Sequence, residues 1–224
     1  MQTFIQLFIT GVTVGCIYGL IAVGFVLIYK SSQIFNFAQG EMVMVGAYLM
    51  WVVLGYFNMP VWLGMLVVFF VVSLAGYGLE RFPLRQMIGQ PVLATIMVTM
   101  GIAVFLRGLA ILLWSEKIGI KFPAIITETT INIFGIPFSN VSFWSLVFVL
   151  FLVLALSWFF LYSRTGLHMR AAAENHQLAQ SMGIRVTLAI APTWALAAIF
   201  SATLGFLLVS MSGIGYGLEE TGFI

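Results

Sequence analysis

The sequence predicts an all-α integral membrane protein, a polytopic helical bundle with about six membrane spans. Hydrophobic residues make up 62% of the 224 residues and charged residues only 7%, and a soluble core does not absorb that much apolar surface. Mean hydropathy is +1.13, in keeping with a lipid environment. The apolar stretches are long and continuous, as spanning helices require, and lack the alternation of a membrane β-barrel.

Each predicted span is an apolar run of the length that a bilayer requires. We expect them at residues 3–29, 41–57, 61–79, 92–114, 142–162 and 188–210. The first run is too long for a signal-peptide core and has no basic residue before it, so we expect it to be retained as a span. All six form a single transmembrane domain over residues 1–224.

The connections between the spans differ in character. Asn58, Met59 and Pro60 form a tight turn, because proline cannot continue a helix. Residues 115–140 form a longer loop, and the alternation over 130–134 indicates a short hairpin within it.

Basic residues set the expected orientation, because loops rich in lysine and arginine stay in the cytoplasm. One side of the predicted topology has Lys30, Arg81, Arg85, Arg164, Arg170 and Arg185. The other side has only Lys117 and Lys121. We therefore expect an exterior N-terminus, an extracytoplasmic loop at 115–140 and a cytoplasmic loop at 163–187.

The loop at 163–187 is the one long polar stretch of the chain. Alanines around Ala173 favour a helix, and Gly183 is a natural helix stop. Arg170 and Glu174 are four residues apart, a spacing that allows them to pair on one helix face. A low-relief helix of this kind suits docking on another protein, although an ordinary solvated loop has the same composition.

A second polar constellation, Asn36, Phe37, Gln39, Gly40 and Glu41, lies between the first two spans. A helix broken there inside the membrane directs amide donors and its positive end toward a passing carboxylate. A plain interfacial turn, with Glu41 next to the positive end of the second helix, fits the residues equally well.

Glycines recur every four residues in the first span, at Gly11, Gly15 and Gly19. They predict close helix packing, against either a partner subunit or a helix of the same chain. Arg107 lies inside the fourth span, where it either extends to the interface or acts as a buried counter-ion.

The sequence has no Walker-type phosphate loop, catalytic triad or paired-carboxylate site, which predicts a protein that is not an enzyme. A lone Cys16 and two isolated histidines make no metal cluster, and no cofactor is expected.

Several motifs together resemble the permeases of bacterial ABC importers, most closely the H-type permease of the branched-chain amino acid family. They are Arg164, Gly166, the run from Arg170 through Glu174 and Ala179 to Gly183 and Ile184, the run Asn36–Glu41, Gly46 to Tyr48, Glu80, Arg81, Arg85, Thr99 and Gly101. The family commonly has histidine where this chain has Gln39. It also usually continues beyond the sixth span, so the chain looks truncated at its C-terminus.

The resemblance implies a function, partners and a location. It implies a permease subunit that moves branched-chain amino acids inward by ATP-driven alternating access, in a bacterial cytoplasmic membrane. The implied partners are a second permease subunit, two cytoplasmic ATPase subunits and an extracytoplasmic solute-binding protein. Urea or short amides are alternative cargo, and an ion-coupled secondary transporter is an alternative class.

The resemblance also implies roles for individual residues. Asn36, Phe37, Gln39, Gly40 and Glu41 are expected to line the substrate pathway. Coupling to the ATPase is expected to involve Arg170, Ala173, Glu174, Ala179 and Gly183.

Overall fold

The structure is a computed structural model that describes residues 2–87, 89–114, 130–133, 136–174, 176–183 and 186–212. Its long helices are α1 (Gln2–Ser32), α2 (Gln39–Trp51), α3 (Val61–Leu79), α4 (Val92–Trp114), α5 (Asn140–Tyr162) and α8 (Val186–Ser212). Shorter helices are the π-helices η1 (Val52–Tyr56) and η2 (Glu80–Leu84), the 3-10 turn η3 (Arg85–Met87), α6 (Arg164–Glu174) and α7 (His176–Ser181). Strands β1 (Thr130–Ile133) and β2 (Ile136–Ser139) pair as an antiparallel hairpin.

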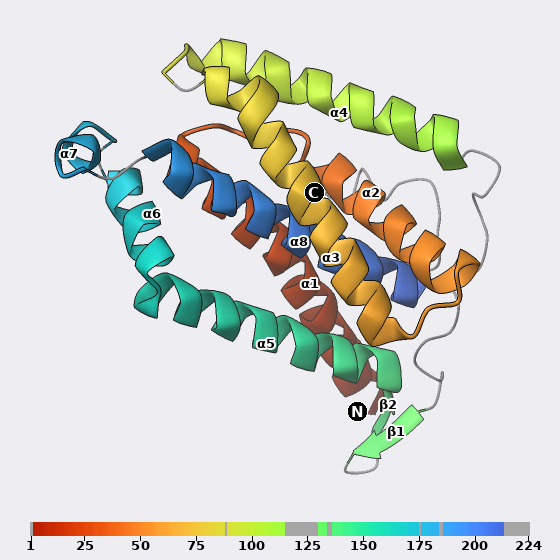
Figure 1. The fold of residues 1–224 in the computed structure, drawn as a ribbon. Coiled ribbons are helices and arrows are strands. Elements are labelled where there is room, and N and C mark those ends of the chain that lie inside the picture. The colour runs from red at the N-terminus through yellow and green to blue at the C-terminus, as the bar shows by residue number, and fades with distance from the viewer. Residues whose placement is uncertain are drawn as a thin grey trace.

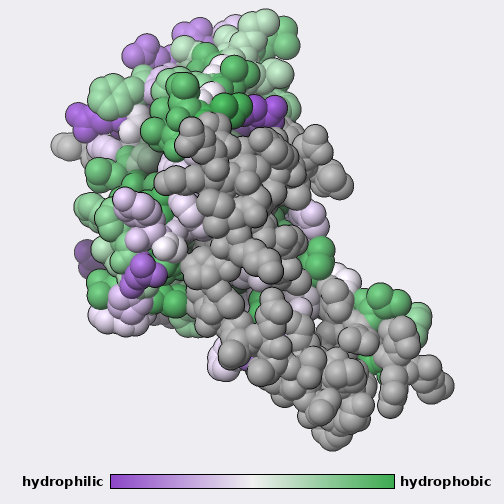
Figure 2. Space-filling view, turned by 90° about the vertical axis from the view of Figure 1, so that its right-hand side faces the viewer, coloured by the Kyte–Doolittle hydropathy of each residue, from purple (hydrophilic) through white to green (hydrophobic). Residues whose placement is uncertain are grey.

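Helix α8 is the centre of the bundle (Figure 1). It packs against α1, α2 and α3, while α4 lies along one edge and α5 along the other. In α8, 72% of the most apolar stretch is buried inside the protein, whereas in α5 the buried share is 11%. The outer helices therefore present apolar side chains to their surroundings, and Figure 2 shows such side chains over much of the described part of one face.

The fold class is confirmed: the described chain is a bundle of long apolar helices with one small hairpin. Within the described residues, five helices are long and apolar enough to cross a membrane. The predicted hairpin near residue 130 is present, and the predicted turn at Asn58–Pro60 separates η1 from α3. Most of the predicted loop at 115–140, with Lys117 and Lys121, lies outside the described residues, as do Ile184, Arg185 and the C-terminal end.

The predicted second span differs from a simple spanning helix. Helix α2 is short, is buried along almost its whole length, and continues only into the π-helical turn η1. The polar segment before it was expected to be a connection between spans. It enters the bundle instead, so α2 begins among the other helices.

Small residues allow α2 and α8 to pack closely. A Cβ atom added at Gly46 would collide with the backbone of Ala202, and one at Gly205 with the carbonyl of Val43. Close backbone approach between small residues is a usual way for membrane helices to associate. This contact fixes α2 against the central helix and so positions the polar residues at its start.

Candidate functional site

The end of α1 turns the chain into the bundle. The hydroxyls of Ser31 and Ser32 donate to the carbonyl of Ile28, at 3.0 and 2.8 Å. Gln33 then adopts φ 58°, and its N–H donates to the carbonyl of Tyr29 at 2.8 Å. A residue in the left-handed region just after the last turn is a common helix stop. The chain leaves α1 here and crosses toward α2 (Figure 1).

The segment that follows α1 lies deep among the helices. Thr99, in the first half of α4, donates its hydroxyl to the carbonyl of Phe35 at 3.1 Å. The side-chain amide of Gln39 donates to the hydroxyl of Ser201, near the middle of α8, at 2.9 Å. A Cβ atom added at Gly24, near the middle of the apolar part of α1, would lie 2.6 Å from Nε2 of Gln39. These three partners place the break between α1 and α2 well inside the bundle.

Asn36 organises the start of α2. Its Oδ1 accepts a hydrogen bond from the N–H of Ala38 at 3.1 Å, and its Nδ2 donates to Oε1 of Gln39 at 3.0 Å. An asparagine that bonds the backbone two residues on stabilises a turn. Asn36 and Gln39 are both 2% exposed. The interfacial-turn interpretation is therefore wrong for this conformation, because such a turn leaves its polar side chains in water.

Glu41 and Arg107 form an ion pair inside the bundle. Nη2 of Arg107 donates to Oε1 of Glu41 at 3.1 Å. The carboxylate side chain is 3% exposed and the guanidinium side chain is 48% exposed. Of the two roles considered for Arg107, the structure supports the counter-ion. Of the other predicted pathway residues, Gly40 is buried and Phe37 half-buried.

Sequence reasoning missed three partners of this segment. Thr99 was predicted only as part of a family motif, no role was predicted for Ser201, and no contact was predicted between Arg107 and Glu41. The available signal was polarity, since a hydroxyl or charge within an apolar span requires a partner. Nothing local in the sequence tells which partner it finds.

The predicted coupling segment forms α6 and α7. Helix α7 ends at Ser181, and Gly183, with φ 80°, follows two residues later. The ion pair that the spacing of Arg170 and Glu174 allows is absent from the described residues. Arg170 donates to the carbonyl of Leu161 at 3.3 Å instead, which draws its side chain back along the chain. Both charged residues are exposed, and Ala173 is half-buried. Ala179 is only 4% exposed and packs inside the chain, so it positions the helix and is not available as a docking surface.

The glycine stripe of α1 has no close neighbour within the described chain. A Cβ atom added at Gly11, Gly15 or Gly19 would find no described atom within 4 Å. The alternative of packing against a described helix of the same chain is therefore wrong.

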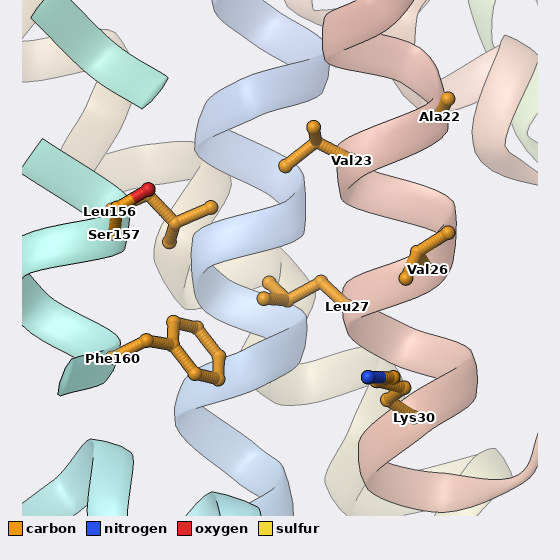
Figure 3. A pocket seen from close by; sticks show the side chains of 8 residues that line it. All are labelled: Ala22, Val23, Val26, Leu27, Lys30, Leu156, Ser157 and Phe160. Carbon is orange, nitrogen blue, oxygen red and sulfur yellow. The ribbon is translucent and has the colours of Figure 1, made fainter. Parts of the chain in front are cut away.

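A separate hollow of about 370 Å³ lies between α1 and α5 (Figure 3). Val26, Leu27, Leu156 and Phe160 are among its apolar lining residues, and Lys30 lies at one end. None of the residues from Asn36 to Glu41 lines this hollow. It is an apolar surface feature apart from the helix break.

The described residues bring together no group of three or more His, Cys, Asp or Glu side chains that could hold a metal ion. The polar groups at the break are amides, hydroxyls, one carboxylate and one guanidinium. They suit the recognition of a small polar or charged solute.

A bundle of apolar helices with a buried, polar helix break is typical of membrane transporters. Residues 7–222 match the sequence profile of the family described as branched-chain amino acid transport system, permease component. The chain belongs to this family, which confirms the predicted membership and the predicted membrane location.

Curated relatives are consistent with this assignment. The chain is 29% identical to the high-affinity branched-chain amino acid transport system permease protein LivH of Salmonella typhimurium, over 94% of this chain and 72% of the relative. It is 29% identical to the corresponding protein BraD of Pseudomonas aeruginosa, over 98% and 74%. A probable branched-chain amino acid transport permease protein of Methanocaldococcus jannaschii is 28% identical, over 87% and 63%. Among solved structures there is no significant match.

Proposed function

We propose that this chain is one transmembrane subunit of an ABC importer that carries branched-chain amino acids inward across the bacterial cytoplasmic membrane. The observation that carries the proposal is the buried helix break at Asn36–Glu41 in a chain of the permease family. The cargo follows from the names of the relatives, all of which specify branched-chain amino acids.

The proposed complex contains a second permease, two ATPase subunits and an extracytoplasmic binding protein. In this arrangement α6 and α7 dock on one ATPase through exposed groups such as Arg170 and Glu174. The open glycine face of α1 is the proposed packing surface for the second permease, because small residues let membrane helices approach closely.

ATP binding draws the two ATPases together and moves α6, and α6 moves the spans that it contacts. Helix α6 packs against α1, α5 and α8. Since α8 also holds Gln39 through Ser201, movement of α8 reaches the helix break. The break is thereby opened first to one side of the membrane and then to the other.

The energy source separates this proposal from an ion-coupled transporter. The sequence counts against ion coupling, since few charges lie within the spans, yet Glu41 is buried inside the bundle. The test is leucine uptake by proteoliposomes that contain the assembled complex. Uptake is expected with binding protein and enclosed ATP, and no uptake with a proton or sodium gradient alone. Gradient-driven uptake by the permease without ATPases would contradict the proposal.

Asn36→Ala tests the pathway role. We expect lower leucine uptake at unchanged membrane abundance, because the substitution removes the acceptor for the Ala38 N–H and frees Gln39. Leaving one buried donor unpaired costs about 1–3 kcal/mol, which is enough to rearrange the local turn. Uptake and immunoblots of the membrane fraction are compared with Asn36→Asp, which keeps the acceptor oxygen. Unchanged uptake in Asn36→Ala would remove this segment from the pathway.

A further inference from the structure

The Glu41 carboxylate is only half satisfied. One oxygen, Oε1, accepts from Arg107, and the other, Oε2, is buried with no hydrogen-bond partner. A buried charged oxygen without a partner is costly, and a water molecule, an ion or a donor group of a ligand can satisfy it. The free oxygen calls for a hydrogen-bond donor, and a cation satisfies it best.

Arg107 is also only partly used. Its bond to Glu41 is its one interaction among the described residues, so Nε and Nη1 are free to donate. Nearly half of the side chain is exposed, in the interior of a membrane-spanning helix. A charged side chain within a span usually faces the interior of a bundle, a water-filled cavity or a partner rather than lipid. The face of α4 that bears Arg107 therefore meets a water-filled passage or another polypeptide.

We propose that Glu41 and Arg107 together bind the two charged groups of the transported amino acid. Oε2 of Glu41 accepts from its ammonium group, and the free nitrogens of Arg107 donate to its carboxylate. The inference rests on the proposed function and adds to it the groups that recognise a zwitterionic α-amino acid. In the present conformation the two side chains satisfy each other, and the cargo competes with that pair.

The surroundings of the pair suit an aliphatic amino acid. Met44 and Tyr48 follow Glu41 along α2, and Ala110 and Trp114 follow Arg107 along α4. These four residues belong to one buried apolar cluster. An apolar region next to two opposite charges matches a small zwitterion with a hydrocarbon side chain. Uncharged urea has neither the two charges nor the hydrocarbon side chain that this site would bind.

Selectivity between charged analogues tests the proposal. Equilibrium binding of radiolabelled leucine is measured on the purified complete transporter without the binding protein. The competitors are isocaproate, which lacks the ammonium, and isoamylamine, which lacks the carboxylate. Unmodified protein is expected to prefer leucine over each by roughly tenfold or more, since a charged hydrogen bond contributes at least that factor.

The single variants are expected to lose one preference each. Glu41→Gln loses the preference over isocaproate and keeps that over isoamylamine, and Arg107→Gln shows the reverse. Glu80→Gln breaks the other described ion pair, to Arg85, and is the matched control that alters neither preference. The inference would be overturned if a variant bound all three ligands more weakly by the same factor, or if both variants kept both preferences.

A charge exchange, Glu41→Arg with Arg107→Glu, separates recognition from structure. A purely structural pair regains both thermal stability and leucine binding on exchange. A recognition site regains thermal stability, while leucine binding stays about tenfold weaker because the charges are reversed relative to the apolar cluster. Recovery of both would overturn the inference and leave the proposed function intact. If the unmodified complex imports no leucine with ATP, the proposed function fails first.

Discussion

Glycines in the bundle differ in what a methyl group added to them would meet. At Gly46 the added Cβ meets the backbone of Ala202 on the neighbouring helix. At Gly24 it meets the tip of the Gln39 side chain, and at Gly78 no described atom lies within 4 Å. A backbone cannot move without shifting its helix, whereas a side-chain tip rotates easily. The same substitution should therefore have three different effects.

Gly46→Ala is expected to destabilise the permease. The methyl group forces α2 away from α8, and overpacking of this kind costs about 1–3 kcal/mol. Thermal unfolding of the purified protein in detergent should show a lower Tm, with lower membrane abundance. Gly78→Ala, where the added Cβ atom also meets no described atom within 4 Å, is the matched control and should leave both unchanged. An unchanged Tm in Gly46→Ala would contradict the close contact between the helices.

Gly24→Ala is expected to reduce transport and preserve stability. The methyl group displaces the Gln39 amide from the hydroxyl of Ser201. Loss of one such hydrogen bond lowers the free energy of unfolding by about 1 kcal/mol, which the fold tolerates. Leucine uptake should fall severalfold at normal Tm. A variant with normal uptake would show that Gln39 need not be held in this position.

The polarity of the residues was enough to predict which of them form the helix break. It was not enough to predict which side chains they contact. Asn36, Gln39 and Glu41 stand out in an apolar chain and could be selected by composition. Glu41 and Arg107 are 66 residues apart, and their pairing depends on how α2 packs against α4. A single sequence contains no signal for such a tertiary contact.

At the scale of elements, α6 and α7 present several exposed side chains on the surface beside the bundle. Leu178 in α7 is 65% exposed, Met182 just after α7 is 83% exposed, and Arg170 in α6 is also exposed. On their inner side, Met169 and Ala172 are each 1% exposed and anchor α6 to the bundle. This division between an anchored and an exposed face is what a helix needs to transmit movement from a docked partner.

Arg170→Glu is expected to weaken association with the ATPase by roughly tenfold and to reduce uptake accordingly. The change reverses a charge on the proposed docking face. Co-purification of the ATPase with a tagged permease measures the effect.

The control for this charge reversal is Arg81→Glu. Arg81 is likewise exposed and likewise donates one intrachain hydrogen bond, at 2.9 Å to the hydroxyl of Tyr77. It lies outside α6 and α7, and its reversal should leave association intact. If both variants lose ATPase association equally, the overall charge of this end of the bundle determines association, and the proposed docking face on α6 and α7 does not.

Helix boundaries were predicted well where apolar runs end at strong signals. The fourth span was predicted at 92–114, which is the range of α4, because Pro91 precedes it. The second was predicted as an ordinary span from 41 to 57. Its residues look equally apolar whether the helix faces lipid or other helices, so the burial of α2 within the bundle could not be inferred.

At the scale of the whole molecule, the basic residues collect at one end of the bundle. Helices α1 and α5 end on the left of Figure 1, the side on which α6 and α7 lie, and α3 ends toward the upper left. The last turn of α1 contains Lys30, and α6 begins with Arg164. Arg81 and Arg85 follow α3. Since basic ends stay in the cytoplasm, α6 and α7 should face the compartment that holds ATP.

Labelling of single cysteines tests this orientation. With Cys16 replaced by serine, Met59→Cys and Met182→Cys form a matched pair, since both methionines are exposed. Met59 precedes the start of α3 and Met182 follows α7, and these two elements lie at opposite ends of the bundle (Figure 1). A membrane-impermeant maleimide added to intact cells should label Met59→Cys and leave Met182→Cys unlabelled, whereas permeabilised cells should label both. Because an ATPase docks only from the cytoplasm, the opposite pattern would place α6 and α7 on the wrong side. The coupling role of Arg170 would then fail with the orientation.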